Sequence, residues 1–227
     1  MIRLMLRIAS SAEEDSIVLD FFAGSATTAQ AVLEQNNEDG GDRRFIMVQL
    51  PEPTENPEYP TIAEIGKERI RRVIGKLDEE DAGKLRAEDE PRRDRGFRVF
   101  KLDESSFKIW DGERAADGDL AEQLRAFADN VREDRSQLDI LYEILLKAGL
   151  PLTAKVEQLE GREIYRVADG LLVICLERAM SQEVVDEISA LKPERAVCLD
   201  TAFGGNDTLK TNAKLQVQSS GIEFRTV

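Results

Sequence analysis

With 227 residues, 41% of them hydrophobic and 33% charged, the chain has the composition of a soluble protein with room for two modest cores. Its formal net charge of −14 argues against a protein that clamps DNA tightly by itself, because lysine and arginine supply much of the nonspecific affinity for phosphates. The absence of histidine excludes histidine-based acid–base catalysis and the commonest zinc sites, and no apolar run approaches the roughly 20 residues of a membrane span.

A short helix, a strand and a second helix are the first elements predicted along the chain. Residues 1–8 fit an amphipathic helix packed on a sheet, and their arginines distinguish them from a secretory signal. The apolar positions of this helix are Ile2, Leu4, Met5 and Ile8. Ile17-Val18-Leu19 suits a buried strand, which breaks at a turn of small residues around Gly24. Thr27 or Thr28 can cap the next helix, and free amide groups at its start favour an anionic moiety.

A second buried strand is predicted from Phe45 to Leu50. The order strand, helix, strand predicts a parallel pair joined by a right-handed crossover. Ligands bind at the carboxyl ends of strands in such sheets, which places residues 20–25 and Gln49 at one edge. This edge is therefore the first candidate binding site.

The next predicted helix begins at a capping box, Thr61-Ile62-Ala63-Glu64, and ends near Leu77. Its apolar stripe consists of Ile62, Ile65, Ile70, Val73, Ile74 and Leu77. The segment from Leu77 to Arg95 is polar and marks a predicted domain boundary, after which residues 97–102 alternate like a strand.

The second half of the chain repeats α/β patterns without a cofactor signature. Its expected elements are helices over 120–131 and 138–145, strands over 155–159, 162–167 and 171–176, a helix that Ser181 opens, a strand over 195–199, and a last helix and strand. The strands on either side of Glu160-Gly161 are expected to form a hairpin. Cys175 and Cys198 fall inside these strands, which favours small core residues over a disulfide or a metal pair and indicates a reducing, cytoplasmic setting.

The amino-acid sequence of the first turn carries a family resemblance. Asp20-Phe21-Phe22-Ala23-Gly24-Ser25, followed by Thr27-Thr28-Ala29, resembles the S-adenosylmethionine motif Phe-x-Gly-x-Gly of amino-methylating DNA methyltransferases. The closest likeness is to the modification subunit of type III restriction-modification systems. Residues 44–52, 199–212 and 222–227 are similar to the same subunit, so the resemblance covers essentially the whole chain.

The resemblance implies an α/β fold class, in which a partial Rossmann-like sheet of an S-adenosylmethionine-dependent methyltransferase precedes a second, smaller α/β domain. The sequence pattern predicts the domains, which are a cofactor-side part over 1–77, a charged linker with connector strands over 78–118, and a C-terminal α/β domain over 119–227. The residues implied to contact the cofactor are Asp20, Phe22, Ala23, Gly24, Ser25 and, at its ribose, Gln49.

By the same resemblance, the full enzyme moves a methyl group from S-adenosylmethionine to an adenine N6 within a short DNA sequence. The implied partners are DNA through the full subunit, the restriction subunit, the remaining N-terminal half of the methyltransferase, and a second copy of the full subunit. No membrane and no metal site are expected.

Two departures from the family pattern affect this expectation. Ala26 stands where the second motif glycine belongs, and its Cβ would crowd the turn if the position needs a positive φ or close contact with the cofactor. The tetrapeptide Asp-Pro-Pro-Tyr or Asn-Pro-Pro-Tyr, which grips the flipped adenine in this family, is absent. Asn56-Pro57-Glu58-Tyr59 differs from it by one residue, but its flanking prolines indicate a connecting loop. We therefore assign no catalytic residue and expect the C-terminal portion of a longer or split subunit, inactive alone.

A second interpretation stays open, namely a non-catalytic assembly or interaction module or a truncated remnant of such a subunit, in which the second domain contacts a partner and the Ala26 turn binds nothing. The basic segments 69–76 and 91–98 favour solvated surface over a DNA or partner patch, because charge runs of mixed sign usually coat exposed faces. Asp200, Asn206, Asp207, Lys210 and Asn212 form a polar cluster at a strand end, for which turn and cap roles are favoured over a metal or phosphate site.

Overall fold

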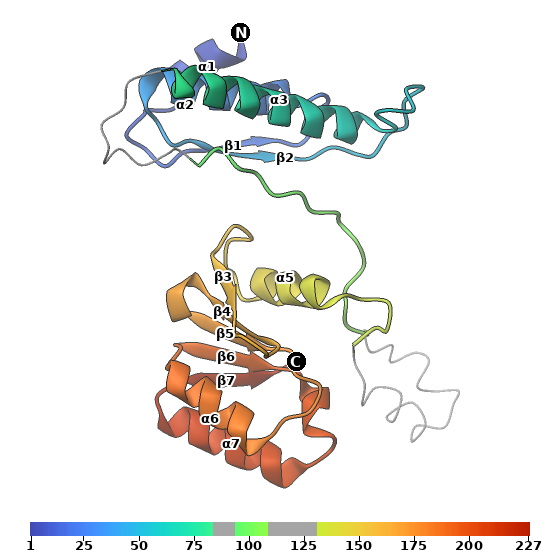
Figure 1. Cartoon of the computed structure of the whole chain (residues 1–227), viewed down its shortest axis with the longest axis vertical. Coiled ribbons are helices and arrows are strands. Elements are labelled where there is room, and N and C mark those ends of the chain that lie inside the picture. Colours follow the sequence, from blue (N-terminus) through green and yellow to red (C-terminus); the bar gives the residue numbers. More distant parts are fainter. Residues whose placement is uncertain (84–93, 109–130) are drawn as a thin grey trace. The chain divides into compact units, whose positions relative to one another are not determined.

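The structure, a computed structural model, describes residues 1–83, 94–108 and 131–227 (Figure 1). It divides into two compact units, Met1–Val99 and Phe100–Val227. Residues 84–93 and 109–118 of the predicted linker, and all but the last residue of the helix expected over 120–131, lie outside the described residues. Within the described parts of the chain, no helix is both long and apolar enough to cross a bilayer.

The first unit contains a two-stranded parallel sheet and helices on one side of it (Figure 1). Its elements are α1 (Ile2–Ala9), β1 (Ile17–Asp20), α2 (Thr27–Asp39), β2 (Arg44–Met47) and α3 (Ile62–Ala82). Val18 lies opposite Phe45 in the register of the two strands. The predicted order of strand, helix and parallel strand is confirmed, although β2 ends earlier than expected.

Only one face of this sheet is covered by the described residues. Val18, Phe45 and Met47 pack against α1, α2 and α3. On the other face, the apolar side chains retain between 50% and 58% of their exposure, and these are Ile17, Leu19, Ile46 and Val48. The prediction of buried strands is therefore wrong here, because an apolar run indicates what a strand can bury and not which neighbours are present.

Three local predictions in the first unit are corrected by the structure. The helix α1 forms as expected, but Leu6 is its buried residue, whereas Leu4, Met5 and Ile8 are exposed. The helix α3 continues to Ala82, five residues beyond Leu77. Residues 97–102 form no strand, and Phe97 instead packs beside the cluster formed by α2 and α3.

The second unit contains a five-stranded mixed sheet in the order β3-β4-β5-β6-β7. Its elements are α5 (Gln137–Lys147), β3 (Val156–Gln158), β4 (Ile164–Val167), β5 (Leu172–Cys175), α6 (Gln182–Leu191), β6 (Arg195–Cys198), α7 (Asp207–Ser219) and β7 (Glu223–Thr226). The strands β3, β4 and β5 pair antiparallel, whereas β5, β6 and β7 are parallel. The predicted hairpin and the predicted helices and strands after it are confirmed.

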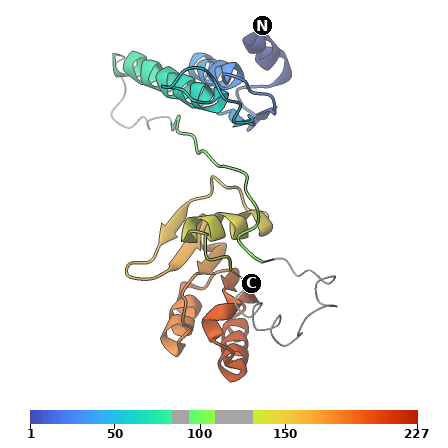
Figure 2. The same cartoon turned by 90° about the vertical axis from the view of Figure 1, so that its right-hand side faces the viewer.

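A single large core occupies the second unit. Every residue of β5 is buried, which requires cover on both faces of the sheet, and α5, α6 and α7 supply it (Figure 2). Cys175 lies opposite Cys198 on neighbouring strands, and both are buried free thiols. The expectation of small core cysteines is therefore confirmed.

Candidate functional site

The turn between β1 and α2 is organised around the carboxylate of Asp20. One oxygen, Oδ1, accepts a hydrogen bond from the Phe22 amide at 3.2 Å, and Oδ2 accepts one from the Thr28 hydroxyl at 2.6 Å. Thr28 thus braces Asp20, while the N-cap of α2 is Ala26 and no side chain caps the helix. The prediction that Thr27 or Thr28 caps α2 is wrong, because the hydroxyl of Thr28 is bound to the carboxylate instead.

Gln49 joins the turn to the end of the second strand. The Gly24 amide donates a hydrogen bond to Gln49 Oε1 at 2.7 Å, and Gln49 Nε2 donates to the Leu50 carbonyl at 3.1 Å. Further up the turn, Ala23 N donates to the Val48 carbonyl at 3.1 Å. The carboxyl ends of β1 and β2 therefore meet at one edge, as the parallel arrangement requires.

The turn contains two residues in the left-handed region, Gly24 with φ 53° and Ala26 with φ 59°. For alanine this conformation costs roughly 1–2 kcal/mol. The methyl group of Ala26 is buried and faces Gly66 of α3, since a Cβ placed on Gly66 would lie 3.3 Å from it. Position 26 does adopt the positive φ that raised doubt from the sequence, but its methyl is accommodated by α3.

The remaining predicted contact residues differ in accessibility. Phe22 is 81% exposed, and its ring centroid lies 5.1 Å from that of the exposed Phe21. Ala23 is buried, whereas Ser25 is half-buried. A Cβ added to Gly24 would meet no atom within 4 Å, so the turn backbone is open to an approaching ligand at this position.

Arg69 of α3 is a turn contact that sequence reasoning missed. Its Nη2 donates to the Ser25 hydroxyl at 3.3 Å, and its Nη1 donates to Gln30 Oε1 at 3.0 Å. From the sequence it belonged only to the basic segment 69–76, and no local spacing indicates a partner more than forty residues away. The other cations of that segment are paired. Arg71 and Arg72 contact Glu68 at 3.9 Å and 2.8 Å, and Lys76 contacts Glu80 at 3.7 Å.

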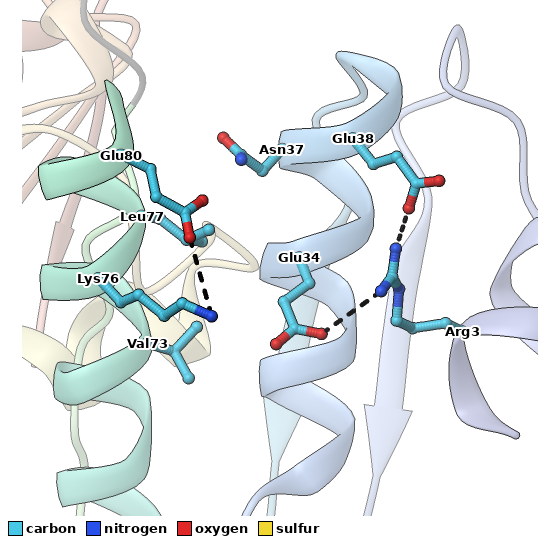
Figure 3. Close-up of a pocket in the computed structure, with 8 residues that line it drawn as sticks. All are labelled: Arg3, Glu34, Asn37, Glu38, Val73, Lys76, Leu77 and Glu80. Carbon is cyan, nitrogen blue, oxygen red and sulfur yellow. Dashed lines mark hydrogen bonds and ion pairs between the residues drawn. The ribbon is translucent and has the colours of Figure 1, made fainter. Parts of the chain in front are cut away.

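A groove runs between α2 and α3, and Figure 3 shows one of its two hollows. That hollow has a volume of about 320 Å³ and an apolar floor that includes Val73 and Leu77. Arg3 of α1 pairs with Glu34 and Glu38 of α2 at its rim. None of the residues lining either hollow belongs to the turn.

The polar cluster at the end of β6 has local partners. Asn206 caps α7, because its Oδ1 accepts a hydrogen bond from the Leu209 amide at 3.0 Å. Lys210 forms an ion pair with Asp200. These contacts support the turn and cap roles favoured from the sequence.

The loop character of Asn56-Pro57-Glu58-Tyr59 is confirmed. Asn56 Oδ1 accepts a hydrogen bond from the Glu58 amide at 3.0 Å, and the four residues belong to no helix or strand. The Tyr59 hydroxyl accepts a hydrogen bond from Arg72 at 3.0 Å.

A strand, a turn opened by a left-handed glycine, a helix and a parallel strand together define an α/β protein with a ligand-type turn at the carboxyl edge of its sheet. Comparison with known proteins shows that the chain is a homologue of the Mod subunits of type III restriction-modification enzymes. It is 29% identical over 223 residues to the EcoP15I Mod subunit of Escherichia coli, which covers 92% of this chain and 31% of that protein.

Two further Mod subunits match shorter stretches at higher identity. The StyLTI Mod subunit of Salmonella typhimurium is 48% identical over 71 residues, which is 29% of this chain and 11% of that protein. The EcoPI Mod subunit of Escherichia phage P1 is 49% identical over 70 residues, which is 28% of this chain and 11% of that protein. No protein-family profile matches the chain. The resemblance to type III modification subunits is confirmed, and the chain spans at most 31% of the length of these relatives.

Proposed function

We propose that this chain is the cofactor-side portion of an adenine-specific DNA methyltransferase of a type III restriction-modification system, and that it binds S-adenosylmethionine at the turn after β1. The homology to Mod subunits supports the enzyme class. The observation that carries the site is the hydrogen bond from Gly24 to Gln49, because it gathers the ends of both parallel strands at the turn.

The residues of the turn fit the methionine part of this cofactor. Asp20 offers a carboxylate, already braced by Thr28, that suits an ammonium group. The open side of Gly24 admits close approach of the ligand to the backbone, and Phe22 exposes an aromatic ring beside it. In this proposal Ala23 and Ser25 complete the contacts to the methionine part.

Gln49 is assigned to the ribose. Its amide oxygen already accepts from Gly24, but that oxygen has a second lone pair and Nε2 a second hydrogen. Gln49 can therefore hold the turn and a ribose hydroxyl together.

When bound, S-adenosylmethionine would supply a sulfonium methyl group for direct displacement by the adenine amine, which would release S-adenosylhomocysteine and a proton without a covalent enzyme intermediate. The residues of this chain bind and orient the cofactor, and positioning of this kind accounts for much of the rate in reactions between two bound substrates. The base-gripping tetrapeptide is assigned to the remaining N-terminal half of the methyltransferase, since a flipped base needs a stacking pocket. The proposed assembly also includes DNA, the restriction subunit and a second copy of the full subunit, in the cytoplasm.

The exposed face of β1 and β2 supports a protein partner at this point. Parallel sheets are normally covered on both faces, and this face presents Ile17, Leu19, Ile46 and Val48. Arg44 is the charged residue that β1 and β2 place on this face, and it is paired with Asp15 at 2.9 Å. An apolar face of this kind suits the remainder of a methyltransferase sheet and its helices better than DNA.

Titration calorimetry of the whole chain with S-adenosylmethionine tests the proposal. We expect binding by the natural chain and its loss in Gly24→Val, because a β-branched residue is strongly disfavoured at a positive φ. Gly161→Val is the matched control, since Gly161 has φ 71° and open space but lies in the hairpin of the second unit. Absence of binding that Ala26→Gly does not restore would contradict the proposal and favour the non-catalytic assembly module.

A further inference from the structure

We propose that Gly66 of α3 is a positioning residue for the turn, because the space it leaves accommodates the methyl group of Ala26 and so fixes the conformation in which the turn meets its ligand. This inference rests on the proposed function for the identity of the ligand. The complementarity of the two positions stands on the packing alone.

Ala26 needs a specific neighbour because of its own conformation. With φ 59° and ψ 38° it is a strained N-cap, and no side chain caps α2 in its place. The residue is only 3% exposed, so its methyl group is enclosed by protein. What encloses it therefore decides whether the turn can hold this shape.

Gly66 provides that enclosure on the side of α3. A Cβ added at position 66 would lie 3.3 Å from the Ala26 Cβ, 3.4 Å from the Gly24 carbonyl oxygen and 3.7 Å from the Ala26 nitrogen. The first distance is tighter than ordinary packing, whereas the other two are ordinary contacts. Only the alanine methyl thus conflicts with a side chain at 66, and the helix approaches the turn closely because position 66 has none.

A second contact from the same helix acts on the neighbouring residue of the turn. Arg69 lies three residues after Gly66, so both lie on one face of α3. Its guanidinium donates to Ser25 at 3.3 Å and to Gln30 at 3.0 Å. The helix therefore contacts the turn at two successive residues, and a shift of α3 would move both.

The geometry also shows why the turn, and not the helix alone, would respond. The Gly24 amide is held by Gln49 on the side of β2, while the Gly24 carbonyl oxygen lies toward position 66 on α3. Displacing Ala26 from α3 would thus rotate the peptide that the proposed ligand approaches.

A double-mutant cycle on the whole chain tests the inference, with Gly66→Ala, Ala26→Gly and the two combined. Gly75→Ala is the matched control, because Gly75 lies in the same helix and a Cβ there meets nothing within 4 Å. Gly66→Ala and Gly75→Ala both gain helix propensity. A loss of ligand affinity that appears only in Gly66→Ala therefore reports the clash with Ala26.

The readouts are calorimetric affinity for S-adenosylmethionine and hydrogen exchange of the Gly24 amide, which needs no ligand. We expect Gly66→Ala to weaken affinity by about tenfold, in the range of couplings between contacting residues, and to speed exchange at Gly24. The double variant should recover both, and Gly75→Ala should change neither.

Three outcomes would overturn the inference. In the first, Gly66→Ala lowers thermal stability but leaves affinity and Gly24 exchange unchanged, so that Gly66 only packs the helix. In the second, adding Ala26→Gly to Gly66→Ala restores neither the affinity nor the Gly24 exchange rate. In the third, Gly75→Ala has the same effects as Gly66→Ala. If the natural chain binds no S-adenosylmethionine, the proposed function fails, and the Gly24 exchange cycle still decides whether Gly66 sets the turn.

Discussion

The two units of this chain differ in how far their apolar sheets are buried. In the second unit, β5 is buried at every position and one cluster joins side chains from α5, α6 and α7. In the first unit, β1 and β2 alternate between exposed and half-buried residues, and the buried side chains divide into two small clusters. The second unit has a closed core, whereas the first has an open one.

Under the proposed function, this difference separates the unit with the larger core from the unit that binds the cofactor. The unit with the large core carries no cofactor motif, and the unit with the motif holds its turn by individual contacts. These are the bonds of Asp20 to Thr28 and of Gly24 to Gln49, together with the packing of Ala26 on Gly66. We therefore expect the second unit to respond mainly to core volume and the first unit to single polar contacts.

The largest effect is expected from a cavity in the second unit. Leu145 of α5 is fully buried, so Leu145→Ala should lower the free energy of unfolding by about 2–5 kcal/mol. Leu146→Ala is the control on the same helix, since Leu146 is 64% exposed, and it should change stability by less than about 0.5 kcal/mol. Urea unfolding measures both. Equal effects would mean that the core of this unit is not closed as described.

A smaller effect should come from Glu143, which ties α5 to residues 105–106. Burial opposes its ionisation, but hydrogen bonds from Lys147, Ser105 and Ser106 outweigh burial and lower the pKa of Glu143 to about 2 from 4.5. A lowered pKa stabilises the folded state above the unfolded pKa, and this stabilisation is lost as the pH falls through 4.5 toward 2.

At neutral pH, Glu143→Gln should therefore lower stability by about 1.5–3 kcal/mol, the range for hydrogen bonds to charged groups. The difference in unfolding free energy between the natural chain and Glu143→Gln should narrow below pH 4.5, because the natural carboxylate takes up a proton. Thermal unfolding from pH 7 to pH 2 measures it, with Glu160→Gln on the exposed hairpin turn as the control. A stability difference that does not change with pH would show that the charge of Glu143 does not contribute to stability.

In the first unit, the corresponding polar test is Gln49. Removing the acceptor of the Gly24 amide in Gln49→Ala should cost about 1 kcal/mol and weaken S-adenosylmethionine binding about fivefold. Gln49→Glu keeps an oxygen acceptor at the same reach and should retain the protection of the Gly24 amide against hydrogen exchange. Loss of protection in both variants would indicate that the contact with Gln49 does not hold the turn.

The smallest effect is expected on the open face of the first unit. Leu19 is 58% exposed, so Leu19→Ser should change the free energy of unfolding by no more than about 0.5 kcal/mol. Denaturant unfolding of the chain alone measures it. A loss well above 1 kcal/mol would mean that this face is already covered in solution, for instance by a second copy of the chain.

Residues close together in the sequence predicted the strands, turns and helix caps that depend on short-range interactions. The apolar run before Gly24 predicted β1, Glu160-Gly161 predicted the hairpin, and Ser181 accepts the capping hydrogen bond of α6 from Val184 as expected. The homology of the turn was also visible in the sequence, because its residue types are consecutive. These features depend on neighbours a few residues apart.

What the sequence missed depends on distant neighbours. The fit of Ala26 against Gly66 joins positions forty residues apart, and neither residue carries a periodic signal. The helix α3 extends past Leu77 where Arg95 pairs with the buried Asp81, fourteen residues earlier in the chain. The exposure of Leu19 depends on which elements are available to cover the sheet, which an apolar pattern cannot reveal.

The open face of the first unit also affects how the chain behaves at high concentration. Apolar patches attract one another, whereas a net charge of −14 keeps copies apart over a distance set by the ions in solution. Salt shortens that distance to roughly 8 Å at 0.15 M and 3 Å at 1 M. We therefore expect electrostatic repulsion to oppose self-association, and we expect the colloidal stability of the chain to decrease as ionic strength rises.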